Sequence, residues 1–200
     1  MTKRIALLLS LSAPFTVAAQ AAPQPPAQAP KDDLVRVALD TAQGRIVLAL
    51  DRGRAPATTA NFLRYVEAKR FDGISFSRAM PYGDGNGLIQ AGITKDARLL
   101  YPPVKHEPPS ATGLTMDVGT VAMANLGPGT ARSDFFILAG PITTFGDSFA
   151  AFGRVVEGMD VVKAILASPV SATKGAGSMK GQMLEPPVTI RTARRADPAG

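Results

Sequence analysis

The sequence predicts a mainly β domain in which short antiparallel strands close into a barrel capped by two helices. The strand-like segments between residues 34 and 192 are short, apolar and separated by turns rich in glycine or proline. Helical periodicity is confined to two segments, one near each end of that region. We expect the strands to close into a barrel because closure removes the exposed edges of an open sheet.

The first expected elements are a β-hairpin and a helix. Residues 34–39 and 45–50 are apolar runs on either side of the turn sequence at 40–44, which is typical of a hairpin. Pro56 stands at the start of a helical pattern over 57–69, where its missing N–H is tolerated.

Further short strands and a second helix follow. The helix is expected at 158–167, because its apolar residues recur with helical spacing and Pro169 stops it. The segment 173–182 is rich in Gly, Lys and Ser and predicts a mobile loop. The expected strands are 74–79, 87–92, 119–124, 134–138, 149–156 and 188–192.

The amino-terminal segment 1–21 has the layout of a secretory signal peptide, with two basic residues, an apolar run and then small residues. Cleavage is expected after Ala19 or Ala21. An Ala/Pro-rich linker is expected at 22–31 and the folded domain at 32–195. The tail 196–200 is expected to be disordered. Arg191, Arg194 and Arg195, just before it, are expected to form a solvated, fraying end. The sequence therefore predicts a periplasmic or secreted protein with no membrane attachment after cleavage.

The residue inventory excludes several kinds of chemistry. The chain has no cysteine and a single histidine, His106, so thiol catalysis and disulfides are excluded and a serine triad would depend on His106. The glycine-rich segment 83–87 lacks the endings of a phosphate loop or a calcium loop. The net charge is +6, but no basic stripe with interleaved aromatics indicates nucleic-acid binding. We expect no metal and no cofactor.

Four short segments carry the most information about function. They combine one arginine, one glutamine and several apolar or aromatic residues on predicted strands, which suits a site that binds a peptide without cleaving it. In chain order they are Phe76-Ser77-Arg78, Gly87-Leu88-Ile89-Gln90-Ala91-Gly92, Met123-Ala124-Asn125 and Ser133-Asp134-Phe135-Phe136-Ile137.

This ordered set resembles the cyclophilin-type peptidyl-prolyl cis-trans isomerases, particularly the bacterial periplasmic ones, over residues 34–192. The resemblance implies an eight-stranded barrel with an outer groove that binds Xaa-Pro in peptides. It also implies an isomerase that acts on proline-containing polypeptides during the folding of exported proteins. We expect a monomer that works without a cofactor.

The resemblance also implies roles for individual residues. Arg78 matches the arginine that directs a hydrogen bond at the proline nitrogen, and Gln90 matches the glutamine that binds the substrate backbone and helps to hold the arginine. Phe136 is expected to line the proline pocket and Phe135 to lie in the core, although period 2 alone would permit the reverse. The expected substrate contacts are Phe76, Leu88, Ala124, Asn125, Phe136, Phe145 and Phe149.

Two departures from the family pattern bear on activity. Gly87 stands where a pocket phenylalanine is common, which leaves one wall missing or supplied by Tyr82. Asp134 replaces a common glutamine and brings an acid that could hold or misdirect Arg78. The alternative hypothesis is therefore a proline-peptide-binding module or holdase with little isomerase activity.

Overall fold

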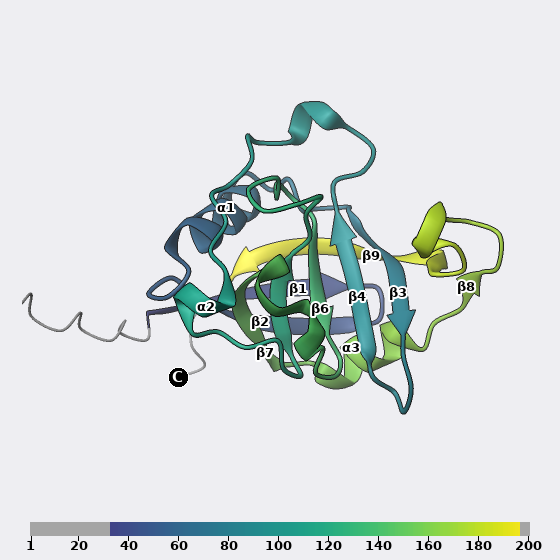
Figure 1. Cartoon of the computed structure of the whole chain (residues 1–200). Coiled ribbons are helices and arrows are strands. Elements are labelled where there is room, and N and C mark those ends of the chain that lie inside the picture. The colour runs from purple at the N-terminus through teal and green to yellow at the C-terminus, as the bar shows by residue number, and fades with distance from the viewer. Residues whose placement is uncertain (1–32, 197–200) are drawn as a thin grey trace, which may run out of the picture.

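The computed structural model describes residues 33–196 of the chain. The predicted signal peptide (1–21), the predicted linker (22–31) and residues 197–200 of the predicted tail lie outside the described residues. Figure 1 shows the described part as one strongly curved sheet with helices and loops around it.

The sheet closes into a barrel. Its nine strands follow one another by antiparallel pairing, and the additional pairing of the first strand with the last closes a ring of eight. The short strand β8 (Val170–Ser171) pairs with β9 (Met183–Arg195) outside this ring. The predicted closed eight-stranded antiparallel barrel is confirmed. Around the ring the order is β1 (Leu34–Thr41), β2 (Gly44–Asp51), β7 (Ala150–Glu157), β5 (Thr120–Met123), β6 (Phe135–Leu138), β4 (Gly87–Gly92), β3 (Ser75–Pro81) and β9 (Met183–Arg195).

The two predicted helices are α1 (Pro56–Glu67) and α3 (Met159–Leu166), which Figure 1 shows at separate ends of the barrel. The structure adds a one-turn helix, α2 (Pro109–Thr112), that has no amphipathic period to predict it. No helix among residues 33–196 is long and apolar enough to cross a membrane. Three 3-10 turns complete the connections: η1 (Ala97–Leu99), η2 (Thr143–Ser148) and η3 (Gly177–Met179).

The barrel interior is filled by alternate strand residues and by the inner faces of α1 and α3. The Phe62 ring of α1 lies 5.1 Å from the Phe135 ring and 5.3 Å from the Phe152 ring, measured between centroids. From the other end, Val162 and Ile165 of α3 are fully buried in the same core. Because successive residues of a strand point to opposite faces, the strands present a second set of side chains on the outside of the barrel.

The last strand is much longer than predicted. The sequence predicts a strand at 188–192, whereas β9 runs from Met183 to Arg195. Glu185, Pro186 and Pro187 break the apolar alternation, so the pattern alone does not extend the strand toward its start. The extra length is held by pairing with β1, β3 and β8 along different parts of β9.

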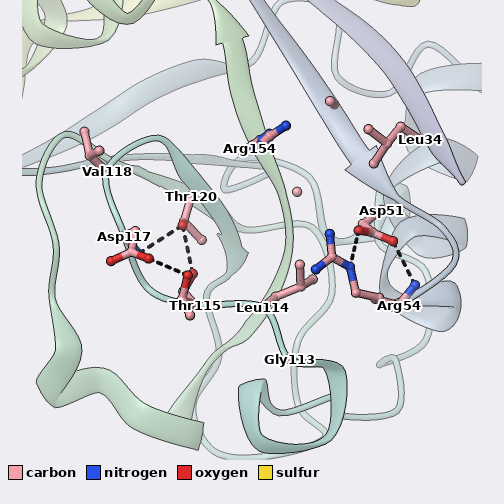
Figure 2. A pocket seen from close by; sticks show the side chains of 12 residues that line it. Leu34, Asp51, Arg54, Gly113, Leu114, Thr115, Asp117, Val118, Thr120 and Arg154 are labelled. Atoms are coloured by element: carbon pink, nitrogen blue, oxygen red, sulfur yellow. Dashed lines mark hydrogen bonds and ion pairs between the residues drawn. The ribbon is translucent and has the colours of Figure 1, made fainter. Parts of the chain in front are cut away.

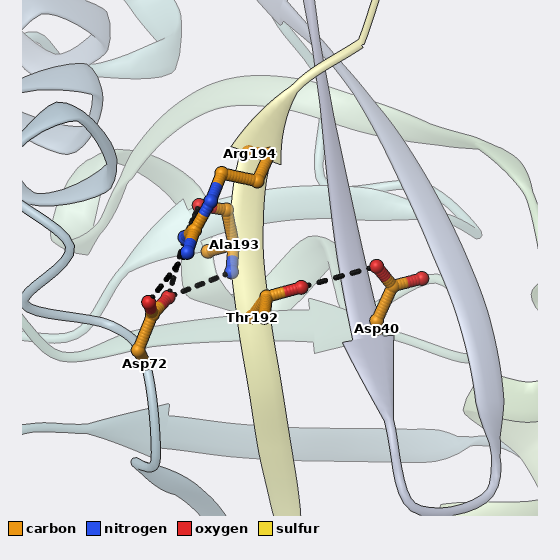
Figure 3. Close-up of polar contacts among 5 residues, drawn as sticks. All are labelled: Asp40, Asp72, Thr192, Ala193 and Arg194. Carbon is orange, nitrogen blue, oxygen red and sulfur yellow. Dashed lines mark hydrogen bonds and ion pairs between the residues drawn. The ribbon is translucent and has the colours of Figure 1, made fainter.

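Polar side chains fasten β9 where it closes the barrel (Figure 3). Thr192 donates a 3.1 Å hydrogen bond to Asp40 of β1. Arg194 donates two hydrogen bonds, of 2.6 and 2.7 Å, to the carboxylate of Asp72, which also accepts the N–H of Ala193. Arg194 is therefore part of a paired strand, and the prediction that it belongs to a solvated end is wrong.

Candidate active site

A register shift in β3 sends two residues of the first motif to opposite sides of the barrel wall. Phe76 lies opposite Ala91 and Arg78 lies opposite Gln90, so the shift falls between them. In a regular strand Phe76 and Arg78 would share a face, and a bulge breaks that alternation. Phe76 is fully buried and its ring lies 6.0 Å from that of Phe135. The prediction that Phe76 contacts substrate is therefore wrong, because its side chain fills the barrel core.

The two predicted catalytic residues and the predicted pocket residue Phe136 lie in a single row across the outer face of the barrel. Arg78 of β3 lies opposite Gln90 of β4, and Gln90 lies opposite Phe136 of β6. The row continues to Ala122 of β5, opposite Phe136, and to Ala151 of β7, opposite Ala122. Neighbouring strands are about 4.8 Å apart, so the row places a guanidinium, an amide and an aromatic ring on adjacent steps.

Three hydrogen bonds hold the guanidinium of Arg78, one at each nitrogen. Nε donates to Oε1 of Gln182 at 2.8 Å, Nη1 donates to Oε1 of Gln90 at 2.9 Å, and Nη2 donates to Sδ of Met80 at 3.4 Å. A guanidinium has five N–H donors, so two on the Nη atoms remain for a ligand. Burial lowers the pKa of Arg78, but arginine stays protonated at physiological pH.

Sequence reasoning missed two partners of Arg78. Met80 lies two residues after Arg78 on β3, so the period of a strand could have placed it on the same face. Gln182 is 104 residues away, beside the start of β9, and no local pattern marks it. The pairing of Arg78 with Met183 across β3 and β9 brings Gln182 to the arginine.

Beside Arg78 and Gln90, the outer face carries a hydrophobic group that we call the outer cluster. It contains the predicted pocket residues Leu88 and Phe136, and Ala124, Phe145 and Phe149 pack at its margin. Phe135 lies in the barrel core, as expected once Phe136 is placed in the pocket. The buried members of the outer cluster are Leu88, Met116, Ala122, Phe136, Leu138, Ile142 and Ala151, and the partly buried ones are Met80, Leu114, Ala124, Phe145 and Phe149.

Three phenylalanine rings form the centre of the outer cluster. Phe136 packs edge-on against Phe145 and Phe149, with centroid distances of 5.8 and 5.2 Å, and the latter two rings lie 4.8 Å apart. Such tilted and edge-to-face contacts are the favoured geometries of aromatic pairs. Phe136 is only 2% exposed, so Phe145 and Phe149 are the more accessible rings.

Ala124 and Asn125 form one border of the outer cluster. The N–H of Ala124 donates to the carbonyl of Asp134 at 2.8 Å, which extends the pairing of β5 with β6. The side chain of Asn125 donates to the carbonyl of Ser148 at 2.8 Å and accepts the N–H of Gly127 at 3.0 Å. Within residues 33–196, the main-chain N–H and C=O of Asn125 make no hydrogen bond.

The residue across from Leu88 is Met80, which is not among the predicted site residues. Met80 also packs against the outer cluster. Tyr82, the predicted substitute for the missing phenylalanine, donates its hydroxyl to the carbonyl of Pro141 and is 39% exposed. Met80 of β3, and not Tyr82, is thus the side chain that packs against Leu88 in the outer cluster.

Asp134 does not hold Arg78 through any of the hydrogen bonds described above. Its carboxylate accepts the hydroxyl of Ser133 at 3.1 Å and occupies the space that a Cβ at Gly92 would need. Burial raises the pKa of the Asp134 carboxyl, and the Ser133 hydrogen bond opposes that rise. The acceptors of Arg78 are the uncharged side chains of Gln90, Gln182 and Met80.

Other polar features lie apart from this row. A cavity of about 250 Å³ is lined by Asp51, Arg54 and Thr120 among others, and contains none of the predicted site residues (Figure 2). Its buried carboxylate, Asp51, is bonded to Nε of Arg54 at 2.6 Å. His106 places Nε2 2.7 Å from the carbonyl oxygen of Asp147. Neither feature contains Arg78, Gln90 or Phe136, although Leu114 of the outer cluster lines part of the cavity.

Comparison with known proteins assigns the family. The family model described as cyclophilin type peptidyl-prolyl cis-trans isomerase/CLD matches residues 35–195. A peptidyl-prolyl cis-trans isomerase of Streptomyces antibioticus is 36% identical over 170 residues, which cover 79% of this chain and 96% of that protein. Peptidyl-prolyl cis-trans isomerase A of Dickeya dadantii is 36% identical over 138 residues, or 64% of this chain and 70% of that protein.

The fold agrees with the family assignment. The crystal structure of a cyclophilin-type peptidyl-prolyl cis-trans isomerase from Cryptosporidium parvum superimposes with a TM-score of 0.69 and 18% identity. The match covers 83% of this chain and 99% of that one. This chain belongs to the cyclophilin-type peptidyl-prolyl cis-trans isomerases and is an enzyme of that class.

Proposed function

We propose that this isomerase acts through Arg78 on Xaa-Pro bonds of exported proteins, with Gln90 holding the arginine and the outer cluster receiving the proline. The observation that carries the proposal is the state of the guanidinium. It is held at three nitrogens, keeps two N–H donors for a ligand, and stands two strands away from Phe136, the central ring of the outer cluster.

The reaction needs little more than such a donor. Resonance gives the peptide bond a rotation barrier of roughly 18–20 kcal/mol, and Xaa-Pro bonds isomerise in tens of seconds or longer without help. In the twisted transition state the proline nitrogen recovers its lone pair and becomes a hydrogen-bond acceptor. A fixed N–H of Arg78 directed at that nitrogen stabilises the twisted state more than either planar state. No proton transfer is involved, so the reaction does not depend on His106.

The outer cluster supplies binding for the proline ring. Phe145 and Phe149 offer half-buried aromatic surface, and Phe136 supports them from below. The free main-chain groups of Asn125 would pair with the extended backbone of the peptide, in the manner of an added strand. The Cryptosporidium parvum enzyme has also been crystallised in the presence of the dipeptide Ala-Pro, and that structure superimposes with a TM-score of 0.66.

The proposed setting is the periplasm or the cell exterior. It rests on the signal-peptide layout of residues 1–21. Fractionation of cells that express the full chain, with sequencing of the mature amino terminus, tests this setting. We expect cleavage after Ala19 or Ala21 and recovery with exported proteins. Recovery of uncleaved chain in the cytoplasm would refute it.

The role of Arg78 is tested by the cis-to-trans rate of an Xaa-Pro reporter peptide with the purified protein. We expect the wild type to accelerate exchange and Arg78→Ala to lower kcat/KM by roughly a hundredfold, because the transition-state hydrogen bond is lost. Arg78→Lys should also be slow, since the three N–H donors of an ammonium sit on one nitrogen and cannot replace the three hydrogen bonds of Arg78 and still leave a donor for the substrate. If the wild type binds the peptide without accelerating exchange, the chain is a proline-peptide-binding module or holdase instead.

A further inference from the structure

Gln182 occupies an unusual position between the loop before β9 and the arginine of the site. Its main-chain carbonyl accepts the N–H of Ala79 at 2.9 Å, and its own N–H donates to the carbonyl of Met179 at 3.1 Å. These bonds fasten the Gln182 main chain both to β3, immediately after Arg78, and to η3. The main chain from which the Gln182 side chain extends is therefore held in place.

Both ends of the Gln182 amide are also engaged. Nε2 donates to the carbonyl of Ser178 at 2.9 Å, and Oε1 accepts from Nε of Arg78 at 2.8 Å. A carbonyl can only accept and a guanidinium can only donate, so the amide has a single orientation that satisfies both partners. The carbonyl of Ser178 thereby fixes the direction in which Gln182 presents its acceptor.

We propose that Gln182 is a positioning residue that sets the plane of the Arg78 guanidinium for isomerisation. The inference rests on the catalytic role proposed for Arg78. Gln90 and Gln182 hold Nη1 and Nε, which lie on different sides of the planar group, so rotation about the side-chain torsions would break one of the two bonds. Gln182 can affect the rate without touching the substrate, because stabilisation of the transition state depends on the geometry of the Arg78 N–H donor.

The side chain of Gln182 must be uncharged as well as long enough to contact Arg78. A carboxylate at this position would form a strong charge-assisted pair with Arg78 and compete with the proline nitrogen for its N–H groups. It would also place an anion beside the carbonyl of Ser178, which Nε2 now satisfies. A glutamine holds the guanidinium without neutralising its charge.

The first test compares two glutamine-to-methionine substitutions, because methionine keeps the length of the side chain and removes the amide. Gln182→Met should lower kcat/KM about tenfold, with most of the loss in kcat. The matched control is Gln43→Met, since Gln43 donates a comparable 2.9 Å bond to Ser168. That control should keep wild-type kinetics. Equal kcat/KM for Gln182→Met and wild type would overturn the proposal.

A second test asks whether the effect passes through Arg78. In the Arg78→Ala background, Gln182→Met should change kcat/KM by less than about twofold, because the group that it positions is gone. A full tenfold loss in that background would show that Gln182 acts only by maintaining the loop and would overturn the proposal. A wild type that does not accelerate the reporter reaction would instead refute the proposed function itself, and the positioning role with it.

A third test uses pH. Gln182→Glu should be least active above pH 6 and recover toward wild-type kcat/KM only below about pH 4, because pairing with Arg78 lowers the pKa of the introduced carboxyl below the usual glutamate value of about 4.3. The wild-type profile should lack this recovery over the same range. A Gln182→Glu profile parallel to the wild type would contradict the proposal, because a merely structural defect does not follow the titration of one carboxyl.

Discussion

The Nη1 atom of Arg78 lies 2.9 Å from the Oε1 atom of Gln90, and the two residues face each other across β3 and β4. Both residues that form this hydrogen bond therefore lie on paired strands of the closed barrel. Side chains placed on such elements are held more exactly than side chains on loops. The arginine does not have to be ordered by the substrate.

Replacing Gln90 by leucine should lower kcat/KM about tenfold and leave the fold intact. The substitution keeps the size of the side chain but removes the acceptor for Nη1, so the guanidinium loses one of its three restraints. The measurement is the reporter-peptide rate together with a thermal unfolding midpoint. Wild-type kcat/KM in Gln90→Leu would contradict a positioning role for this bond.

The neighbouring phenylalanines of β6 should respond differently to truncation. Phe135→Ala should lower the free energy of unfolding by about 3–5 kcal/mol, because its ring fills the barrel core between Phe62 and Phe76. Phe136→Ala should chiefly raise KM, because it removes the ring that supports Phe145 and Phe149. Chemical denaturation and reporter kinetics on both variants check this contrast, and a reversed ranking of the two effects would contradict it.

Gly87→Ala should destabilise the protein by about 2 kcal/mol or more. A Cβ at Gly87 would lie 2.5 Å from the carbonyl oxygen of Met80 and 2.9 Å from Leu166, and the residue has φ +152°. Gly127→Ala is the matched control, because its φ is +143° and a Cβ there would meet nothing within 4 Å. If both variants unfold at the same denaturant concentration, the steric argument fails. The missing pocket phenylalanine therefore has no room to be restored at this position.

Asp72→Asn should destabilise the protein near pH 7 by about 0.5–1.5 kcal/mol, since Asp72 and Arg194 are partly exposed. The hydrogen bonds of Arg194 hold the pKa of Asp72 below its usual value in the folded state. The stabilisation is present above the unfolded pKa and is lost as the pH falls through the lower, folded one. Wild type and Asp72→Asn should therefore converge near pH 2 in unfolding experiments.

The control for that experiment is Asp96→Asn. Asp96 is paired with Arg98 two residues away, and the Arg98 side chain is 91% exposed. Its replacement should change the free energy of unfolding little at any pH, because such a local exposed pair contributes almost nothing. A difference between Asp72→Asn and wild type that persists at pH 2 would show that the loss is steric rather than electrostatic.

The site residues show where pattern reading from the sequence succeeds and where it fails. The resemblance put Phe136 in the pocket, and alternation then placed Phe135 on the opposite face; both hold because β6 is a regular strand. The resemblance listed Phe76 as a substrate contact, and there it failed, because a bulge in β3 shifts the register between Phe76 and Arg78. A bulge depends on how neighbouring strands pair, and a single strand's sequence does not reveal it.

The sequence by itself determined the class of fold, the order of the barrel elements, and the arginine and glutamine of the row. Those features depend on local periodicity, turn residues and ordered motifs, all of which are visible in short stretches of the sequence. Only the tertiary structure decided the length of β9, the inward turn of Phe76, the pairing of Arg194 with Asp72 and the approach of Gln182 to Arg78. Each of these joins segments far apart in sequence, and closure of the barrel brings them together.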